Sequence, residues 1–330
     1  MGPRNVSRWN NTVTATIGVV VVSYDSAQDL PACLPALIAA DGVGRVVVVD
    51  NASTDESCEV VRGFADDRIE LLALETNTGF AGGCNRGFAV LGDDVEVVAF
   101  VNPDVAVTPD CLRFAGDALA ADPTLAGVAP RLMRAGGETV DSVGQVLKPM
   151  TLEVRDRGFN RSLSPELLAP TPVLAACGAL AVYRRTALEA VEGPSGPWAE
   201  EFFCFWEDLE LGWRLVNAGY RITALPDAVA THGRGAGAAE GRGPLRWRRT
   251  VDLEACVMTN RWMTLVRHLN TLDLVPRLPV LLSWDLALAA VSVARRPGLL
   301  PAIARRWPLV IGEWRARGDR SRRRLRELPW

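Results

Sequence analysis

Apolar and polar positions follow two alternating periods along the first hundred residues. Four short, mainly apolar runs predict strands: residues 17–22, 45–50, 69–74 and 95–101. The last of them is β-branched and nearly all apolar, as expected of a strand covered on both faces. Between the first two runs, apolar residues recur at helical spacing: Leu30, Leu34, Leu37 and Ile38. The order strand, helix, strand implies parallel pairing, so the pattern predicts an α/β fold with a doubly wound, mostly parallel sheet.

Local signals predict where further helices begin. Ser53 and Glu56 form a capping box, which predicts a helix through about residue 64. Thr108 followed by Pro109 predicts another start, with the threonine as its cap. The glycine-rich stretch 79–91 predicts the helix between the third and fourth strands.

Several of the predicted strands end on polar residues: Ser23, Asp50, Asn77 and the segment 102–104. In open α/β sheets ligands bind at the carboxyl ends of the strands, so Asp104 is a candidate ligand-facing group. Asn102, Pro103 and Asp104 are also ordinary turn formers. The stretch by itself is compatible with both interpretations.

The positions of the glycines and of the single lysine disfavour or exclude several classes of nucleotide-binding enzyme. The first strand is not followed by G-x-G-x-x-G, which disfavours nicotinamide and flavin enzymes. The single lysine, Lys148, lies outside any P-loop motif, which excludes P-loop kinases and lysine Schiff-base chemistry. Gly79, Gly82 and Gly83 would let the backbone approach a ribose or phosphate, although tight helix–sheet packing explains them equally well.

A second cluster of candidate residues lies between 200 and 235. Four residues at helical spacing face the core: Leu209, Gly212, Trp213 and Val216. Gly219 closes this helix, and Glu207 and Asp208 occupy its first turn. Acids in the first turn of a helix complement its dipole. Glu207 and Asp208 therefore have either this structural role or a catalytic one. His232 ends the strand predicted at 227–231, where it is either a structural residue or a ligand.

Composition is that of a globular protein, with 48% hydrophobic and 23% charged residues in a chain of 330. The net charge of −3 conceals an asymmetry. Residues 1–241 carry 18 basic and 32 acidic side chains, a balance of −14, whereas residues 242–330 carry 18 and 7, a balance of +11. The basic tail is therefore the part expected to meet an anionic partner.

Cysteine usage and the chain start predict a cytoplasmic protein. The seven cysteines are scattered without a C-x-x-C pair, which favours reduced thiols. The polar start leads directly into a strand, so no signal peptide is expected. The apolar stretch 278–294 contains Asp285 and is judged too short and too polar for a membrane span.

The tail interleaves basic and apolar residues. Arginines recur at 246, 248–249, 295–296, 305–306 and 320–326, among stretches containing Trp284, Trp307 and Trp314. This pattern suits helices lying on an anionic bilayer, as in a peripheral protein on the inner face of the cell membrane. A helical cap packed on the rest of the protein is the alternative. Nucleic acid is not an expected partner, because the remaining surface is acidic and no nucleic-acid motif is present.

Taken together, the motifs are far more specific than any one of them. In order along the chain they read "VVVVSYDS", "VVVVDNASTDES", "NTGFAGGCNRG", "FVNPDV", "ACGALAVYRRTALEAVEG", "FWEDLELGWRLVNAGY" and "PDAVATHG". This series resembles family 2 glycosyltransferases of the GT-A fold, in particular the bacterial rhamnosyltransferase-like branch. The resemblance covers about residues 15–240 and implies an inverting transfer of a sugar from a nucleoside diphosphate, dTDP-rhamnose or a UDP-sugar. The acceptor would be a glycan or a polyprenyl-linked glycan of the cell envelope.

The resemblance also implies roles for individual residues. Asp208, with Glu207 as the neighbouring candidate, would be the general base, and Asp104 with His232 would hold Mg²⁺ or Mn²⁺ on the diphosphate. Asp50 would contact the base and Asn102 the ribose. The full set of expected donor-binding residues is Ser23, Tyr24, Asp50, Asn77, Gly79, Gly82, Gly83, Asn85 and Asn102.

Two departures from the family pattern stand out. Asn102 replaces the first acid of the usual Asp-x-Asp metal motif, and "EGPSGPWAEEFF" replaces a Gly-Gly-Phe-Asp-Glu run near residue 193. The second departure predicts a different acceptor-side loop.

The chain is expected to divide into an arm (1–14), a donor half (15–125), an acceptor half (126–241) and a basic helical tail (242–330). Two other functions stay open. A catalytically silent nucleotide-sugar-binding or membrane scaffold is one, and a nucleotidyltransferase, which lacks its G-x-G-T-R-L loop here, is the other.

Overall fold

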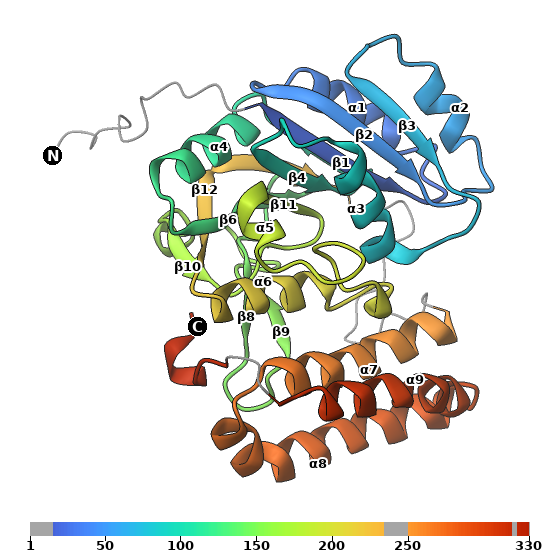
Figure 1. The fold of residues 1–330 in the computed structure, drawn as a ribbon, viewed down its shortest axis with the longest axis vertical. Helices are drawn as coiled ribbons and strands as arrows, with labels where there is room; N and C mark the ends of the chain where they lie inside the picture. Colours follow the sequence, from blue (N-terminus) through green and yellow to red (C-terminus); the bar gives the residue numbers. More distant parts are fainter. Residues whose placement is uncertain (1–15, 234–249, 319–321, 330) are drawn as a thin grey trace, which may run out of the picture.

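The computed structural model describes residues 16–233, 250–318 and 322–329 (Figure 1). The predicted arm, 1–14, and the domain boundary predicted at 241 lie outside these residues. Four arginines of the predicted basic pattern do so too: Arg246, Arg248, Arg249 and Arg320.

Strands and helices alternate through the first half of the chain, as the hydrophobic periods predict. The strands are β1 (Ile17–Ser23), β2 (Val43–Asp50), β3 (Ile69–Ala73), β4 (Val97–Val101), β5 (Val105–Val107), β6 (Leu125–Arg134), β7 (Val140–Ser142), β8 (Gln145–Leu147), β9 (Val154–Asp156), β10 (Thr171–Val173), β11 (Leu180–Arg184) and β12 (Arg221–His232). The α-helices are α1 (Leu30–Ile38), α2 (Ser57–Arg62), α3 (Gly79–Val90), α4 (Cys111–Ala121), α5 (Arg185–Glu189), α6 (Glu207–Asn217), α7 (Val251–His268), α8 (Thr271–Arg295) and α9 (Leu299–Arg315). Short 3₁₀ turns occur at Pro165–Leu167, Glu200–Phe202 and Leu325–Glu327.

One large sheet organises the first 233 residues. Its strand order is β10-β12-β6-β11-β4-β1-β2-β3, with β5 beside β12 and β7 beside β6. Strands β4, β1, β2 and β3 are mutually parallel, and β12 is parallel to β6. β11 runs antiparallel between β4 and β6. The predicted α/β class with a mostly parallel sheet is therefore confirmed.

The valine-rich strands are buried on both faces, which explains their continuous apolar character. Val19 and Val21 of β1 pack into a cluster with α1 and α4, whereas Val20 and Val22 pack with α3 and α5 on the other face. Helix α3 approaches closely, since a Cβ at Gly87 would lie 2.3 Å from Val20 Cγ1. All seven cysteines are free thiols, four of them buried.

Two predicted helix starts are wrong. Helix α2 begins at Ser57, and Ser53 caps nothing: its hydroxyl accepts a hydrogen bond from Asp25 N–H (3.0 Å) and its own N–H donates to Asp50 Oδ2 (3.0 Å). Helix α4 begins at Cys111, because the Thr108 hydroxyl donates to Val229 O of β12 (3.0 Å). In both cases the hydroxyl bonds to a residue distant in sequence, Asp25 or Val229, so the local sequence could not predict the contact.

Helices α7, α8 and α9 form a layer below the sheet, which we call the helical cap (Figure 1). α7 packs along α9 and against α6. Buried apolar side chains from α6 and the cap share one cluster, which includes Trp213, Met263, Leu265, Leu281 and Val310. The predicted basic tail is thus a folded layer, and α7 fastens it to the sheet domain.

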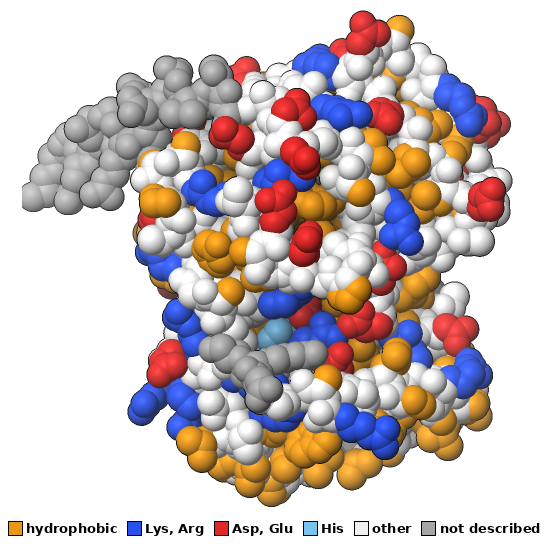
Figure 2. Space-filling model, in the orientation of Figure 1, with side chains coloured by type: hydrophobic (Ala, Val, Ile, Leu, Met, Phe, Trp, Pro, Cys, Tyr) orange, Lys and Arg blue, Asp and Glu red, His pale blue; other side chains and the backbone are white. Residues whose placement is uncertain are grey.

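The cap also exposes many apolar side chains, which we call the apolar face. It consists of Leu272, Val275, Val280, Leu282, Trp284, Leu286, Leu288 and Val291 of α8 and Leu300, Trp307, Leu309, Ile311 and Trp314 of α9. Figure 2 shows hydrophobic side chains gathered along the lower edge of the molecule, over α8. So many exposed large apolar side chains on neighbouring helices are unusual for a protein surrounded by water.

The prediction that the apolar stretch 278–294 is too short and too polar for a membrane span is wrong by length and composition, because helix α8 extends it to 25 residues. Of the described residues, only α8 forms a helix long and apolar enough to cross a membrane by length and composition, and 11% of its most apolar window is buried. Near its middle, Asp285 Oδ1 accepts a hydrogen bond from Arg261 Nε of α7 (3.0 Å). The helix therefore lies along the cap with a charged group turned toward its neighbour.

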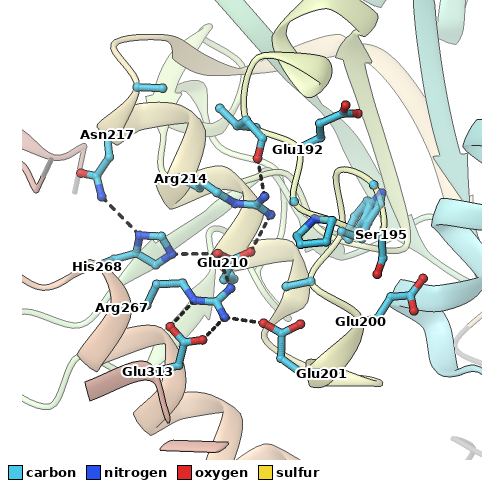
Figure 3. Close-up of a pocket in the computed structure, with 17 residues that line it drawn as sticks. Glu192, Ser195, Glu200, Glu201, Glu210, Arg214, Asn217, Arg267, His268 and Glu313 are labelled. Carbon is cyan, nitrogen blue, oxygen red and sulfur yellow. Dashed lines mark hydrogen bonds and ion pairs between the residues drawn. The ribbon is translucent and has the colours of Figure 1, made fainter. Parts of the chain in front are cut away.

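A buried ion cluster joins α6 to the cap (Figure 3). Glu210 of α6 is fully buried, and its Oε1 accepts from Arg267 Nη1 (3.0 Å) and His268 Nε2 (2.9 Å) of α7. Arg267 also binds Glu313 of α9 and Glu201. These side chains line a pocket of about 490 Å³. Arg267 of α7 therefore connects α6, α9 and the 3₁₀ turn Glu200–Phe202.

Protonation states follow from this network. Burial alone would raise the pKa of Glu210, but Arg214 and Arg267 outweigh it and hold that pKa well below the usual range. Burial lowers the pKa of His268 to about 4. His268 is therefore neutral at pH 7, with Nε2–H donating to Glu210 and Nδ1 accepting from Asn217 Nδ2 (3.3 Å).

Replacing Arg267 with methionine should destabilise the fold strongly. Arg267→Met keeps an unbranched apolar stem but removes one of the two arginines that pair with the buried Glu210 carboxylate, the other being Arg214. Breaking a buried ion pair by removing one partner costs about 3–5 kcal/mol. Urea unfolding at pH 7 measures the free energy of unfolding.

Arg305→Met is the matched control. Arg305 Nη2 binds Asp252 Oδ1 of α7 (2.9 Å), and the two side chains are 65% and 78% exposed. An exposed pair contributes less than about 1 kcal/mol. Equal losses in the two variants would show that the cluster around Glu210 does not hold the cap.

Candidate active site

The carboxyl ends of β1, β2 and β4 lie side by side at one edge of the sheet. Ser23, the last residue of β1, is in register with Asp50, the last residue of β2. After β4, Asn102 N–H donates to Ala179 O (2.9 Å), just before β11. The polar residues predicted at strand ends thus share one edge.

Asp104, His232 and Asp141 form a row of three side chains. His232 Nε2 lies 3.3 Å from Asp104 Oδ1, and His232 Nδ1 lies 2.7 Å from Asp141 Oδ2. β5 pairs with the end of β12, and Gly233 N–H donates to Asp104 O (2.7 Å), which fixes the backbone on both sides. Residues 104 and 232, far apart in sequence, are therefore brought together as the resemblance implies.

The charge state of His232 depends on its two carboxylate neighbours. Burial disfavours the imidazolium form, but the hydrogen bonds and charges of Asp104 and Asp141 outweigh it and raise the pKa of His232 to about 9. The pair of acids thus makes this a site that attracts positive charge.

Asp208 stands at the start of α6, behind a left-handed residue, Trp206 (φ 72°). Its Oδ2 accepts hydrogen bonds from Gln145 Nε2 (2.8 Å) and Gly178 N–H (2.9 Å). Burial raises the pKa of Asp208, while these hydrogen bonds oppose part of that rise. A carboxylate with a raised pKa is better suited to accept a proton near neutral pH.

Glu207 has a different environment from its neighbour. It is buried, and its Oε2 has no hydrogen-bond partner among the described residues. Burial and then the charge of Asp208 raise the pKa of Glu207 well above the usual range.

One short segment, from Asp141 to Gln145, contacts both His232 and Asp208. Asp141 of β7 binds His232, and Gln145 of β8, four residues later, binds Asp208. Asp104 and Asp208 are thus linked through neighbouring residues of one turn. Asp141 and Gln145 thus connect the predicted metal-ligand pair with the predicted base.

The donor side of this edge contains buried polar atoms with no partner among the described residues. Asp50 uses Oδ2 to accept from Ser53 N–H, while its Oδ1 has no hydrogen bond. The Ser23 hydroxyl is fully buried and also has none. Unpaired buried polar atoms are rare in folded proteins, and a ligand that supplies their partners explains them. Tyr24, beside them, is 50% exposed.

The start of α3 is held by two asparagines. Asn77 Oδ1 accepts from Gly79 N–H (2.8 Å), and Asn51 Oδ1 accepts from Thr78 N–H (2.8 Å). Asn51 Nδ2 donates back to Gly79 O (2.8 Å). Gly79 has φ +74°, and a Cβ there would lie 2.3 Å from Phe203 O, so only glycine fits.

The other predicted donor residues of α3 are packed against protein. A Cβ would meet Thr78 at Gly82 and Val22 at Gly83, each 2.6 Å away, so packing by itself accounts for both glycines. Asn85 accepts from Trp198 N–H (2.9 Å) and donates to Trp198 O (2.8 Å), which ties α3 to the loop that departs from the family pattern.

Comparison with known proteins identifies the family. The model of Glycosyl transferase family 2 matches residues 18–191, more than half of the chain. The chain belongs to glycosyl transferase family 2. A relative from Mycobacterium tuberculosis, named N-acetylglucosaminyl-diphospho-decaprenol L-rhamnosyltransferase, is 28% identical over 248 residues, which cover 67% of this chain and 76% of the relative. The resemblance seen in the motifs is confirmed.

Solved structures of similar fold support the predicted GT-A architecture. The mannosyltransferase PcManGT from Pyrobaculum calidifontis, in complex with GDP-Man and Mn²⁺, superposes with a TM-score of 0.55 at 20% identity, covering 92% of this chain and 86% of that one. S. aureus TarS 1-349, in complex with UDP-GlcNAc, gives 0.56 at 17% identity, covering 92% and 83%. This family 2 glycosyltransferase therefore has the predicted fold.

Asp104 and His232 could hold a divalent cation shared with a substrate if the cation displaced the proton that the raised pKa of His232 favours. Among residues 16–233, 250–318 and 322–329, no group of three or more His, Cys, Asp or Glu is placed to hold a metal ion. Magnesium is commonly bound by one or two protein carboxylates together with substrate phosphates. Asp141, hydrogen-bonded to the far nitrogen of His232, resembles the carboxylates that orient metal-binding histidines.

Sequence reasoning missed the residues that position this site: Asn51, Asp141, Gln145 and Gly178. Asp141 and Gln145 lie in three-residue strands too short for a periodic signal. A buried acid between apolar residues, as in "TVDSV", was the available sign.

Proposed function

We propose that this glycosyltransferase moves a sugar from a nucleoside diphosphate to a lipid-linked acceptor in cell-envelope polysaccharide synthesis. The observation that carries the proposal is the turn from Asp141 to Gln145, which holds His232 beside Asp104 on one side and Asp208 on the other. The name of the Mycobacterium tuberculosis relative supports L-rhamnose as the sugar and a polyprenyl diphosphate-linked acceptor.

The donor would bind along the carboxyl edge of β1, β2 and β4. The free Oδ1 of Asp50 suits the imide N–H of a pyrimidine base, and we favour dTDP over UDP. Asn102 would contact the ribose, and Asp104 with His232 would hold Mg²⁺ or Mn²⁺ at the diphosphate. When bound, the cation supplies positive charge that stabilises the leaving diphosphate.

The acceptor hydroxyl would approach Asp208 from the opposite side. Asp208 accepts the hydroxyl proton as the oxygen attacks the anomeric carbon, and the bond from that carbon to the diphosphate breaks. Gln145 and Gly178 hold the carboxylate in place during this transfer. One base and one displacement give inversion of the anomeric centre, with no enzyme nucleophile.

The apolar face would place the enzyme on the inner surface of the cell membrane. Leu286 and Leu272 are 68% and 67% exposed, and basic residues such as Arg305 lie nearby on the cap. Amphipathic helices of this kind insert apolar side chains while arginines meet anionic lipid head groups. Since Asp285 of α8 is paired with Arg261 of α7, we favour a surface-bound α8 over a spanning one.

Nucleotide binding should require the cation and Asp104. At a concentration one hundred times Kd, dTDP with Mn²⁺ should stabilise the protein by about 2.7 kcal/mol, because ligands that bind only the folded state add stability. EDTA or Asp104→Asn should remove most of this gain in a thermal-shift titration. Equal stabilisation with Mn²⁺ and with EDTA would refute the cation's role.

Asp208→Asn should separate transfer from donor binding. The substitution removes the base but preserves shape, so transfer should fall by about 10²–10⁴-fold while the dTDP thermal shift stays unchanged. Product formation from dTDP-rhamnose and a prenyl diphosphate-linked N-acetylglucosamine is the measurement.

Glu207→Gln is the matched control for that variant. Glu207 is buried with a raised pKa, and glutamine copies its shape, so a mild loss is expected. Loss of transfer in Glu207→Gln together with activity in Asp208→Asn would assign the base to Glu207.

The apolar face should bind anionic vesicles. The full chain should co-sediment with phosphatidylglycerol liposomes, more weakly at high salt, and alkaline carbonate should release it as it releases surface-bound proteins. Leu286→Glu should reduce binding several-fold. Leu168→Glu, at a residue 48% exposed on the sheet domain, is the control and should bind like the wild type.

A further inference from the structure

A groove of about 560 Å³ runs between the three helices of the cap and β9. Its walls are mainly apolar and include four tryptophans: Trp206, Trp262, Trp284 and Trp307. Its volume lies within the range of about 300–1,000 Å³ found for small-molecule sites. Figure 1 shows the cap helices side by side, with α8 farthest from the sheet.

The charged residues in the groove are already neutralised by protein partners. Arg261 pairs with Asp285 (3.0 Å) and also donates to Leu152 O (2.8 Å). Glu254 pairs with Arg296 (2.9 Å). A ligand would therefore meet hydrocarbon walls and few unsatisfied charges, which suits an apolar chain.

The mouth of the groove is continuous with the apolar face. Leu282, Leu286 and Leu300 belong to both, and they are 46%, 68% and 60% exposed. If this face lies on a bilayer, a lipid chain can pass from the membrane into the groove without crossing water.

The inner wall of the groove is built by the same two segments that hold Asp208. Trp206 lines it and is the residue before α6, two positions from Asp208. Val154 of β9 also lines it and is in register with Leu147 of β8, the strand whose Gln145 binds Asp208. The groove thus leads from the membrane-facing surface to the elements that carry the base.

We infer that this groove binds the first isoprenoid units of the polyprenyl diphosphate-linked acceptor. The inference rests on the proposed function and adds a site for the lipid part of the substrate. The diphosphate would lie between the groove and the sheet domain, and the sugar hydroxyl would reach Asp208. The rest of the chain would stay in the bilayer, since the groove has room for only part of it.

The test uses the full-length protein and farnesyl diphosphate, a soluble isoprenoid, in calorimetric titrations without detergent. Ala289 lines the groove, whereas Ala290, its neighbour on α8, is exposed and does not. Ala289→Trp should fill the groove and weaken farnesyl diphosphate binding at least tenfold. Ala290→Trp makes the same change outside the groove and should bind like the wild type.

Two further measurements separate isoprenoid binding from binding of the diphosphate group or of any alkyl chain. Leu300→Glu, at an exposed position that the fold should tolerate, puts a charge at the mouth and should also weaken binding several-fold. Inorganic diphosphate should bind equally to all variants, and dodecyl phosphate should bind more weakly than farnesyl diphosphate. Equal farnesyl binding by Ala289→Trp and Ala290→Trp, no binding at all, or an equal affinity for dodecyl phosphate would overturn the inference.

The proposed function is tested separately in the same samples. Stabilisation by dTDP with Mn²⁺ should be unchanged in Ala289→Trp, because the donor lies at the sheet edge. Loss of farnesyl binding with intact donor binding is the expected result. Farnesyl binding without any nucleotide binding would refute the glycosyltransferase proposal and with it the acceptor assignment.

Discussion

The geometry of the site depends on how the first turn of α6 is held. Glu207 and Asp208 are successive residues and point about 100° apart, while Glu210, three residues after Glu207, has its own partners from the cap. Glu210 is locked by Arg267 and His268 of the cap, and this buried ion cluster fixes the rotation of α6 about its axis. Asp208 is thereby turned toward Gln145 and Gly178, while Glu207 is turned into the protein. Removing the cap contact would release the proposed base as well.

The buried ion cluster around Glu210 accounts for part of the positive charge of residues 242–330. Their balance of +11 suggests an exposed basic surface, yet Arg261 and Arg267 are buried and paired with acids of α8, α6 and α9. Much of the positive charge serves internal attachment, and the exposed feature of the cap is apolar. The two alternatives for the tail, a packed cap and a membrane-facing surface, are therefore compatible, because they use opposite sides of the same helices.

The sequence predicted the sheet and the location of the site because parallel strands carry strong signals. Continuous valine runs indicate strands buried on both faces, and the polar residues after them mark one edge of the sheet, where Ser23 and Asp50 are in register. It could not predict Ser53 or Thr108, because their hydroxyls bind partners on other loops and strands. Nor could it find Asp141 and Gln145, whose roles arise only when β7 and β8 pack against β12 and α6.

A fixed cap also constrains which acceptors can react. A lipid-linked sugar has a set distance between its isoprenoid chain and its hydroxyl groups, and the cap and α6 set the distance between the proposed lipid groove and Asp208. Arg267 makes that distance rigid, since it binds both Glu210 of α6 and Glu313 of α9. On the proposed function, selection of the acceptor hydroxyl would then depend on the distance between the proposed lipid groove and Asp208. Specificity of this kind needs few direct contacts to the sugar.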